Sequence, residues 1–443
     1  MRPRAIDIAA GSAQYRHRHA EPETGLAAMC REAFDQVMVV PLCAEPASFV
    51  DGYDGAVAGG GRLLVIAVIN GRQTADDWVH SANAQCFREL ATRFSLQEIG
   101  NGGWLGRDTR TTLLVVDRFT TSRRLPSRQG VGLARKIGAD IALVLIAAGQ
   151  VRSPFIAMMD ADARLPDDYF DRIAELAPDC SAALFPFWHE PSGRPAVDRA
   201  TALYEIRLRY FQRGLLWAHS PFAFHSMGST MVLHALRYAQ VRGVPARQAA
   251  EDFYLLDKLC KIRPIVRLHG APIHIRSRVS DRVPFGTGAE AAKLAGSTPL
   301  ELYHPDCFSA VREVTRTLGR LSRLSPDAHL TSLSEMGPLT RAFLKSHGAP
   351  AVWQKLREHA PNTLARLRHL HEWFDGFRTL KLMHAVRDQA APSLGWREAL
   401  HQAPFIDDLD DGDDDGECLT AARTRLLRAE QTQPRLVGPS LYR

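Results

Sequence analysis

Short apolar runs alternate with longer amphipathic stretches over the first half of the chain. Four runs rich in β-branched residues are typical of strands buried on both faces. These runs are 37–40, 63–69, 112–117 and 155–159. Between them, 74–94 and 127–149 carry apolar residues at helical spacing, with Thr74 as the expected N-cap of the first helix. Strands that alternate with helices predict an α/β fold with a mixed, mostly parallel sheet, which the apolar run 182–188 would extend.

The second half of the chain has a helical pattern. Amphipathic helices are predicted over 199–219 and 246–262, and the chain from about residue 300 onward looks all-helical. The acidic run 407–417 has no apolar face, so we expect a solvated linker or tail there. The predicted organisation is an N-terminal extension, an α/β domain, a helical region and an acidic, flexible tail. Their predicted ranges are 1–30, 31–295, 296–402 and 403–443.

Length and composition narrow the class of protein. With 443 residues the chain exceeds a typical core of about 100 to 200 residues, so we expect two domains or one large domain with appendages. No run approaches the roughly 18 apolar residues of a membrane span, and the N-terminus lacks the apolar core of a secretory signal. We therefore expect a cytoplasmic protein with no integral membrane segment.

Cysteine usage and charge exclude further classes. The seven cysteines are scattered, which suits reduced thiols and indicates neither a zinc site nor a disulfide framework. The 55 basic and 49 acidic residues are spread along the chain, as on an ordinary solvated surface. No nucleic-acid-binding motif is present, so we expect no nucleic-acid partner.

Two aspartates directly follow the apolar run 155–159. Asp160 and Asp162 alternate by two, so both carboxylates would point to one side at the carboxyl edge of the sheet, where open α/β sheets bind ligands. Two hard oxygen ligands suit Mg²⁺ or Mn²⁺ and leave coordination sites for a diphosphate. The alternative is a turn or helix-cap role.

Other residues fall into an order that includes this D-x-D pair. In chain order they are Pro41, Glu45, Asp117, Arg135 within "GVGLARK", the pair Asp160 and Asp162, and the pair Glu251 and Asp252. Over about residues 36–285 the chain resembles the family 2 glycosyltransferases, whose nucleotide-sugar-binding fold is called GT-A. The resemblance implies this fold and a nucleotide-sugar donor.

The resemblance also implies how the donor nucleotide is held. In that family the first loop and the residue that ends the third strand contact the base and ribose, and an arginine of the next helix lies near the nucleotide. The residues at these positions are Pro41, Glu45, Asp117 and Arg135. The usual aromatic-Asn-Glu is here Cys43-Ala44-Glu45, a departure at the base-binding position.

The two acidic pairs receive catalytic roles by the same resemblance. Asp160 would contact the ribose or metal-bound water, and Asp162 would ligate the metal. An inverting transfer also needs a base for the acceptor hydroxyl, which we assign to Asp252 with Glu251 as its neighbour or orienter. The alternative for Glu251 and Asp252 is that both only favour the dipole of a helix whose first turn they occupy.

A basic segment follows the acidic pair. Arg276, Arg278 and Arg282 stand near Gly286 and Gly288, an arrangement suited to gripping phosphate or carboxylate. We therefore predict donor contacts from Arg278 and Arg282. A surface strand with solvated arginines is the alternative.

Histidines and a tryptophan near the predicted strands could add to the site. His274, or less favourably His269, could complete the metal shell, although a lone histidine is more often structural. Trp188 and His189 could stack on a sugar ring or belong to the core.

These expectations combine into one function with alternatives. We predict a metal-dependent, inverting glycosyltransferase that moves a sugar from a nucleotide-diphosphate donor to a hydroxyl acceptor. Within enzymes, the alternative is a retaining GT-A transferase that makes a small anionic glycoside. From another class, the alternative is a non-catalytic GT-A-like scaffold. The Q-x-x-R-W signature and membrane helices of processive polysaccharide synthases are missing, so we expect no such synthase.

Overall fold

The computed structural model describes residues 5–53, 61–109, 111–246, 250–278, 294, 299–323, 335–407 and 415–439. Within these ranges ten strands form one sheet in the order β15-β11-β8-β10-β6-β1-β2-β5-β4-β3. In that order they are β15 (Leu436–Val437), β11 (Ile265–Arg267), β8 (Ala182–Leu184), β10 (Met231–His234), β6 (Phe155–Met158), β1 (Gln36–Leu42), β2 (Leu63–Asn70), β5 (Thr111–Arg118), β4 (Gly103–Arg107) and β3 (Gln97–Gly100).

The centre of the sheet confirms the predicted α/β architecture. β6, β1, β2 and β5 are neighbouring parallel strands, and they are the four predicted from apolar runs. β10 runs antiparallel between β6 and β8. The apolar run 182–188 forms two strands, because β8 ends at Leu184 and β9 (Phe187–Glu190) joins a second sheet.

One edge of the sheet was not predicted. The hairpin of β3 and β4 pairs with β5, and it turns at Asn101 and Gly102, which both have positive φ. Asn-Gly is a favoured pair for such a two-residue turn. Because the residues of β3 are largely exposed, this hairpin carries no apolar run that would reveal it.

Helices cover both faces of the central sheet. One face packs against α2 (Asp77–Phe94), α4 (Tyr169–Ala174) and the 3₁₀ helix η2 (Ala47–Gly52). The other face packs against η1 (Pro22–Met29), α1 (Ala5–Arg18), α3 (Val131–Ala147), α6 (Ala235–Gln240) and α7 (Glu251–Ile262).

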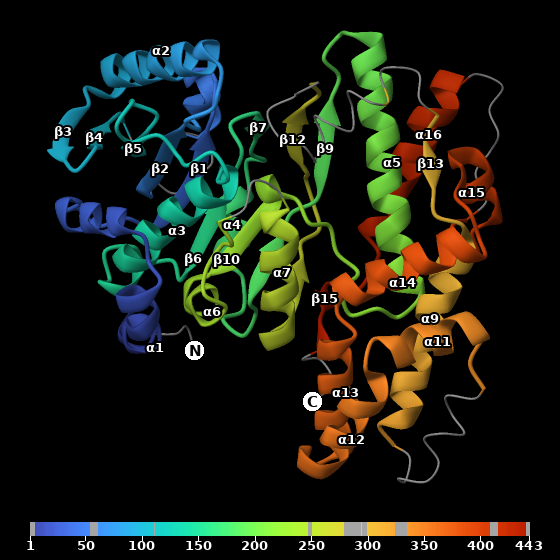
Figure 1. Cartoon of the computed structure of the whole chain (residues 1–443). Coiled ribbons are helices and arrows are strands. Elements are labelled where there is room, and N and C mark those ends of the chain that lie inside the picture. The colour runs from blue at the N-terminus through green and yellow to red at the C-terminus, as the bar shows by residue number, and fades with distance from the viewer. Residues whose placement is uncertain are drawn as a thin grey trace.

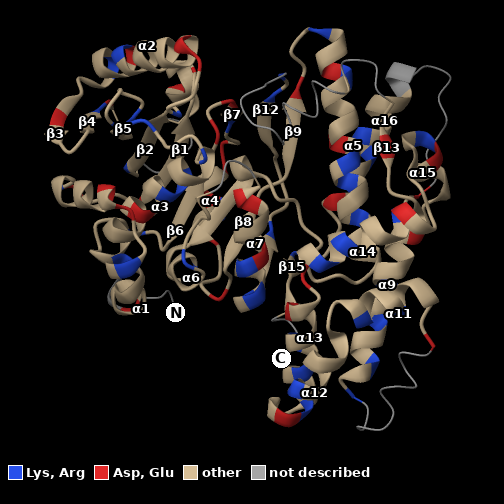
Figure 2. Ribbon diagram, in the orientation of Figure 1, with Lys and Arg blue, Asp and Glu red and all other residues tan. Residues whose placement is uncertain are grey.

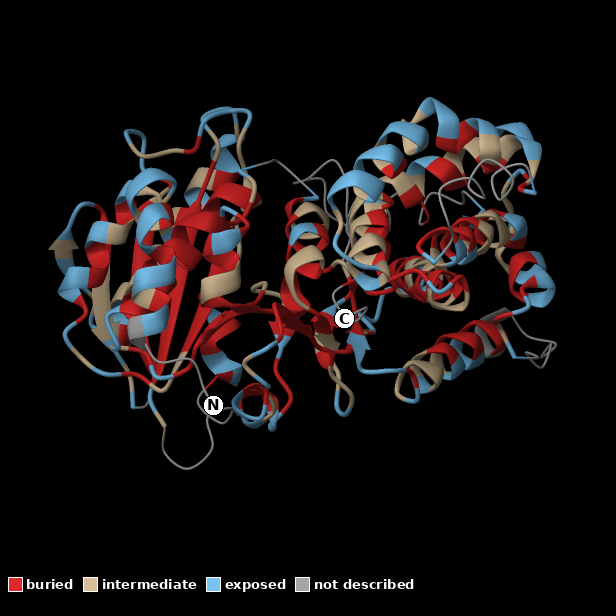
Figure 3. Cartoon of the chain, turned by 90° about the horizontal axis from the view of Figure 1, so that it is seen from below, coloured by how far each residue is buried: buried red, intermediate tan, exposed pale blue. Residues whose placement is uncertain are grey.

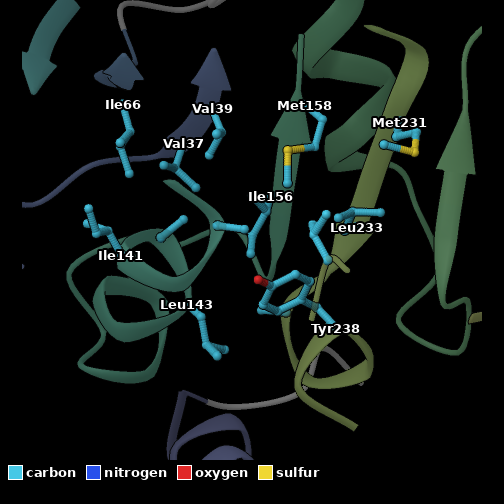
Figure 4. Close-up of a cluster of buried hydrophobic side chains, with 14 of the residues drawn as sticks. Val37, Val39, Ile66, Ile141, Leu143, Ile156, Met158, Met231, Leu233 and Tyr238 are labelled. Carbon is cyan, nitrogen blue, oxygen red and sulfur yellow. The ribbon is translucent and has the colours of Figure 1, made fainter. Parts of the chain in front are cut away.

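Side chains alternate between these two cores because successive residues of a strand point to opposite faces. In β1, Val39 belongs to one core and Met38 and Val40 to the other. Figure 4 shows Val39 and Ile66 on the strands and Ile141 on α3, all three in the core on the face covered by α3 and α6. In Figure 3 the strands of this sheet are buried, and the outer sides of the covering helices are exposed.

The first predicted helix begins later than expected. α2 begins at Asp77 with Asp76 in the N-cap position, so Thr74 is not the cap. Residues 72–75 form a turn instead, because the Ala75 N–H bonds the Arg72 carbonyl.

A small second sheet lies beside the carboxyl end of β6. Its order is β7 (Ala163–Arg164), β12 (Ile273–Arg276) and β9, with β12 antiparallel to β7 and parallel to β9. The 3₁₀ helix η4 (Gly228–Thr230) leads into β10. This sheet therefore brings the chain after Asp162 next to the chain before Arg278.

The C-terminal helices share a third core. They are α9 (Pro305–Leu321), α11 (Pro338–Ser346), α12 (Ala349–His359), α13 (Thr363–Trp373), α14 (Gly376–Gln389), α15 (Trp396–Gln402) and α16 (Asp415–Glu430), with β13 (Glu301–Leu302) paired to β14 (Leu394–Gly395). The long helix α5 (Pro195–Trp217) packs into the same core, whose buried residues include Ile206 of α5, Phe308 of α9 and Leu382 of α14. Figure 1 shows α5 between the strands and these helices.

The end of the chain differs from the expected flexible tail. We predicted a loosely held segment over 403–443, but α16 packs against α5, and β15 pairs with β11 at the edge of the central sheet. The acidic run hides this, because the apolar residues that anchor the helix, Leu419, Ala422 and Leu426, come after it. Residues 408–414 lie outside the described ranges.

No helix in the described ranges combines the length and apolarity that crossing a membrane requires. Basic and acidic residues are both spread over the helices, as Figure 2 shows.

Candidate functional site

The strand order reverses beside β1. From β1 the chain continues to β2 and then β5 on one side, and it later returns to place β6 on the other side of β1. Connections that leave in opposite directions create a crevice at the carboxyl ends of the two strands, where open α/β sheets bind ligands. Glu45 follows β1 at this point, and Asp160 and Asp162 follow β6.

Arg135 connects the two predicted acidic pairs. Its Nη2 lies 2.6 Å from Oδ1 of Asp160, and its Nε lies 3.1 Å from Oε1 of Glu251. Its Nη1 donates to the Gly228 carbonyl at 3.1 Å. The Arg135 side chain is only 4% exposed, so its guanidinium is committed to protein acceptors. We predicted this residue near the nucleotide, and the structure shows it joining β6, η4 and α7.

Gly228 is required by this arrangement. A Cβ atom at Gly228 would lie 2.0 Å from Nη2 of Arg135, which is far inside van der Waals contact. Glycine therefore allows the guanidinium to reach the backbone there.

A second arginine joins the first loop to the D-x-D pair. Arg278 Nη2 lies 2.7 Å from Oδ2 of Asp162, and its Nη1 lies 2.7 Å from Oε1 of Glu45. Burial, against the opposing effect of Arg278, raises the pKa of Asp162 to about 6, and the nearby Asp160 and Glu45 carboxylates add to the rise. Three segments that are distant in sequence thus meet in one acidic cluster.

Glu251 and Asp252 lie in the first turn of α7, which begins at Glu251 and not at residue 246 as predicted. Ala250 before them has a left-handed backbone with φ of 59°. Burial, followed by the neighbouring Glu251 carboxylate, raises the pKa of Asp252 to about 7, and burial also raises the pKa of Glu251. Oδ1 of Asp252 accepts a hydrogen bond from the Phe253 N–H at 2.8 Å. Asp252 is therefore a carboxylate poised to gain or lose a proton near neutral pH.

Pro41 and Asp117 also lie at the carboxyl ends of their strands. Pro41 is buried in β1 beside Val68. The Asp117 carboxylate accepts hydrogen bonds from the Phe119 and Thr120 N–H groups, each at 3.0 Å, and from the Thr120 hydroxyl at 2.6 Å. Its observed contacts therefore fix the turn after β5.

The described residues do not bring His274 together with Asp160 and Asp162 in a three-residue metal shell. His274 lies on β12 opposite Arg164 and Trp188, and its Nδ1 is 3.1 Å from an oxygen of Glu190. Strand alternation puts it on the sheet face that carries Arg164 and Glu190, so it does not join Asp160 and Asp162. Among the residues that the structure describes, no group of three His, Cys, Asp or Glu side chains could hold a metal ion. Arg282, Gly286 and Gly288 lie outside the described ranges.

The two carboxylates still fit a divalent metal that is held in another way. Mg²⁺ and Mn²⁺ prefer oxygen ligands, and Mg²⁺ usually binds through one or two carboxylates together with substrate phosphates and water. Asp160 and Asp162 offer two carboxylates, and Asp160 is 33% exposed to solvent. This donor set suits a metal that arrives with a diphosphate better than one held by protein ligands alone.

A buried network behind the small sheet escaped the sequence analysis. His189 is fully buried, with Nδ1 2.7 Å from Oε1 of Glu205, while its Nε2 has no partner. Glu205 also binds Arg423 of α16 at 2.8 Å, and the Arg423 guanidinium stacks over Trp188. Trp188 and His189 thus anchor the C-terminal helix, and no local signal reveals a partner 218 residues away from Glu205.

A cavity at the amino ends of the central strands is separate from the carboxylates at their carboxyl ends. It has a volume of about 250 Å³ and is lined by residues that include Gln36, Ser153 and Phe155. These residues stand at the amino ends of β1 and β6, away from the carboxylates.

Neither a protein-family model nor a curated protein sequence matches the chain.

Proposed function

We propose that the chain is a metal-dependent glycosyltransferase of the GT-A type, which moves a sugar from a nucleotide-diphosphate donor to an acceptor hydroxyl. The observation that carries the proposal is the cluster of carboxylates at the strand-order reversal. Asp160, Asp162, Glu251 and Asp252 gather there with one buried arginine, Arg135, and the pKa values of three of them are raised. Perturbed carboxylates grouped in a crevice are typical of catalytic sites.

The donor half of the reaction concerns the diphosphate. When bound, Mg²⁺ or Mn²⁺ would neutralise the leaving nucleoside diphosphate as the bond between sugar and phosphate breaks. Asp162 and the more exposed Asp160 would hold that ion. Arg278 has a guanidinium fork that can donate to phosphate oxygens in the same place.

The acceptor half requires a base. Asp252 would take the proton of the acceptor hydroxyl as its oxygen forms a bond to the anomeric carbon from the side opposite the leaving diphosphate, which inverts the configuration. Glu251, held by Arg135, would orient the first turn of α7. Because the base must be ionised and its pKa is about 7, the transfer rate should rise with pH and level off above neutrality.

A donor screen tests the proposal. The protein is incubated with UDP-, GDP- and dTDP-sugars and Mn²⁺, and donor hydrolysis is followed. We expect turnover that depends on the metal and falls at least a hundredfold in Asp162→Asn. The exposed Asp167 offers a matched control, so Asp167→Asn should keep full turnover. Absence of turnover, together with absence of a thermal shift with any nucleoside diphosphate, would overturn the proposal in favour of a scaffold.

A second variant tests the base. Asp252→Asn should lower sugar transfer by roughly 10²- to 10⁴-fold, the usual contribution of general base catalysis, while the affinity for the donor stays within about threefold. Transfer and donor affinity that fall together would show that Asp252 has a structural role. Determining the anomeric configuration of the product separates inverting from retaining chemistry.

A further inference from the structure

Arg135 and Arg278, which bind the carboxylates of the candidate site, are held in different ways. Arg135 is 4% exposed and binds a backbone carbonyl as well as two carboxylates, so it is fixed from three sides. The Arg278 side chain is 31% exposed, and among the described residues it pairs with the carboxylates of Asp162 and Glu45. Those two carboxylates are themselves only 13% and 9% exposed. Arg278 thus reaches from the solvent side onto a buried acidic pair.

This position conflicts with metal binding at Asp162. A divalent cation and a guanidinium seek the same carboxylate oxygens, and Oδ2 of Asp162 is already 2.7 Å from Arg278 Nη2. Two cations that close together repel one another strongly in a partly buried site. A metal that ligates Asp162 therefore requires Arg278 to withdraw.

Withdrawal is favourable only when another anion is present. Removing one partner from a buried ion pair leaves the remaining charge without compensation, which is strongly unfavourable. A diphosphate supplies such an anion next to the metal, and guanidinium groups bind phosphate through two parallel hydrogen bonds. Partial exposure of Arg278 allows its side chain to turn toward a ligand that enters from solvent.

We propose that Arg278 is an exchangeable counter-cation that couples metal binding to donor binding. In the free protein the Arg278 guanidinium neutralises Asp162 and Glu45. It moves to the donor's diphosphate when a metal binds Asp162. This inference rests on the proposed function and deepens it. It makes the free protein a poor metal binder, so that metal and nucleoside diphosphate bind together.

Binding measurements on the full chain test the exchange without any turnover. The Mn²⁺ affinity of the protein alone is measured by electron paramagnetic resonance of free Mn²⁺. The affinities for UDP, GDP and dTDP are measured by equilibrium dialysis without metal and with saturating Mn²⁺. In the unchanged protein, Mn²⁺ should strengthen binding of at least one nucleotide by tenfold or more, as coupling between two sites requires.

Arg278→Gln should shift both quantities. The protein alone should bind Mn²⁺ about tenfold more tightly, because the competing guanidinium is gone, and Mn²⁺ should strengthen nucleotide binding by a smaller factor than before. Arg278→Lys, which keeps the charge but loses the fork, should lie between the two. Arg164→Gln is the matched control, since the Arg164 side chain is 62% exposed and also pairs with a carboxylate, that of Glu190. This variant should change neither the Mn²⁺ affinity nor the nucleotide affinity. Thermal unfolding of each variant confirms that it folds.

Three outcomes would overturn the exchange. Mn²⁺ affinity of Arg278→Gln within twofold of the unchanged protein would show that Arg278 does not compete with the metal. Nucleotide binding that does not respond to Mn²⁺ but is lost in Arg278→Gln would mean that Arg278 permanently replaces the metal. The proposed sugar transfer would then stand without its metal dependence. An unchanged protein that binds none of UDP, GDP and dTDP under any condition would remove the proposed function together with the exchange.

Discussion

Two buried charge clusters are built on the same helix, α3, and they differ in how many donors each carboxylate receives. In the anchor cluster, Asp140 accepts hydrogen bonds from the Tyr15 hydroxyl at 2.6 Å, the Tyr238 hydroxyl at 2.7 Å, the Lys136 ammonium at 2.6 Å and the Glu21 N–H at 2.9 Å. One fully buried carboxylate is thus surrounded by donors. This cluster fastens α1 and the segment after it to the α/β core.

The second cluster, the Arg135 cluster, begins at the residue directly before Lys136 on α3. There a single buried guanidinium faces Asp160 and Glu251, with Asp252 close enough to add to its electrostatic field. Acids outnumber the cation, and burial raises the pKa values of Glu251 and Asp252. The difference teaches that α3 saturates one carboxylate with donors where the charges serve stability, and lets two carboxylates share one guanidinium where the proposed ligand would complete them.

Breaking the anchor cluster should have the largest effect. Asp140→Ala removes the buried acceptor that the Lys136 ammonium shares with two tyrosine hydroxyls, and leaves Lys136 with the His19 carbonyl and the Glu21 carboxylate. We expect the free energy of unfolding to fall by about 3 to 5 kcal/mol, as when one partner of a buried ion pair is removed. Urea denaturation measures it, and Asp167→Ala, at an exposed site, should stay within about 0.5 kcal/mol. A loss below 1 kcal/mol for Asp140→Ala would contradict the comparison.

Removing a carboxylate from the Arg135 cluster should raise the free energy of unfolding above neutral pH, where Asp140→Ala lowers it. A carboxylate whose pKa is higher in the folded protein than in the unfolded chain stabilises the fold below the unfolded pKa, and this contribution is lost as pH rises through the folded value. For Asp252 the window runs from about 4 to about 7. Asp252→Asn should therefore match the unchanged protein at pH 4 and be more stable at pH 8, by on the order of 1 to 2 kcal/mol.

The same denaturation series, repeated between pH 4 and pH 8, checks this sign. A difference between the two proteins that does not change with pH would show that Asp252 is not strained by its neighbours. A difference that grows toward acid would reverse the assignment, because it would mean a lowered pKa.

The smallest effect is expected at His274, which lies outside both clusters. His274→Ala should change the free energy of unfolding by less than about 1 kcal/mol, since its contact with Glu190 is partly exposed. In the presence of UDP or GDP, its Mn²⁺ affinity should stay within twofold of the unchanged protein. A tenfold loss of Mn²⁺ affinity would return His274 to the metal shell that the sequence predicted.

Much of the α/β core could be predicted from the sequence. The four inner strands β1, β2, β5 and β6 are continuous apolar runs, and such runs have few alternatives to a strand buried on both faces. The D-x-D aspartates could be placed at a strand end for the same reason. Local pattern did not reveal β3 and β4, because their residues form no apolar run. It also did not reveal that α16 and β15, which follow the acidic run, are anchored to the rest of the fold.

The sequence by itself determined which residues could carry the chemistry, because residue type and position after a strand are local properties. Only the tertiary structure decided how they combine. Arg135 and Glu251 are 116 residues apart, and their contact follows from the packing of α3 and α7 on one face of the sheet. Strand alternation likewise turned His274 toward Glu190, and strand order brought Arg278 to Asp162 and Glu45. Such pairings depend on long-range order and register, which local periodicity does not encode.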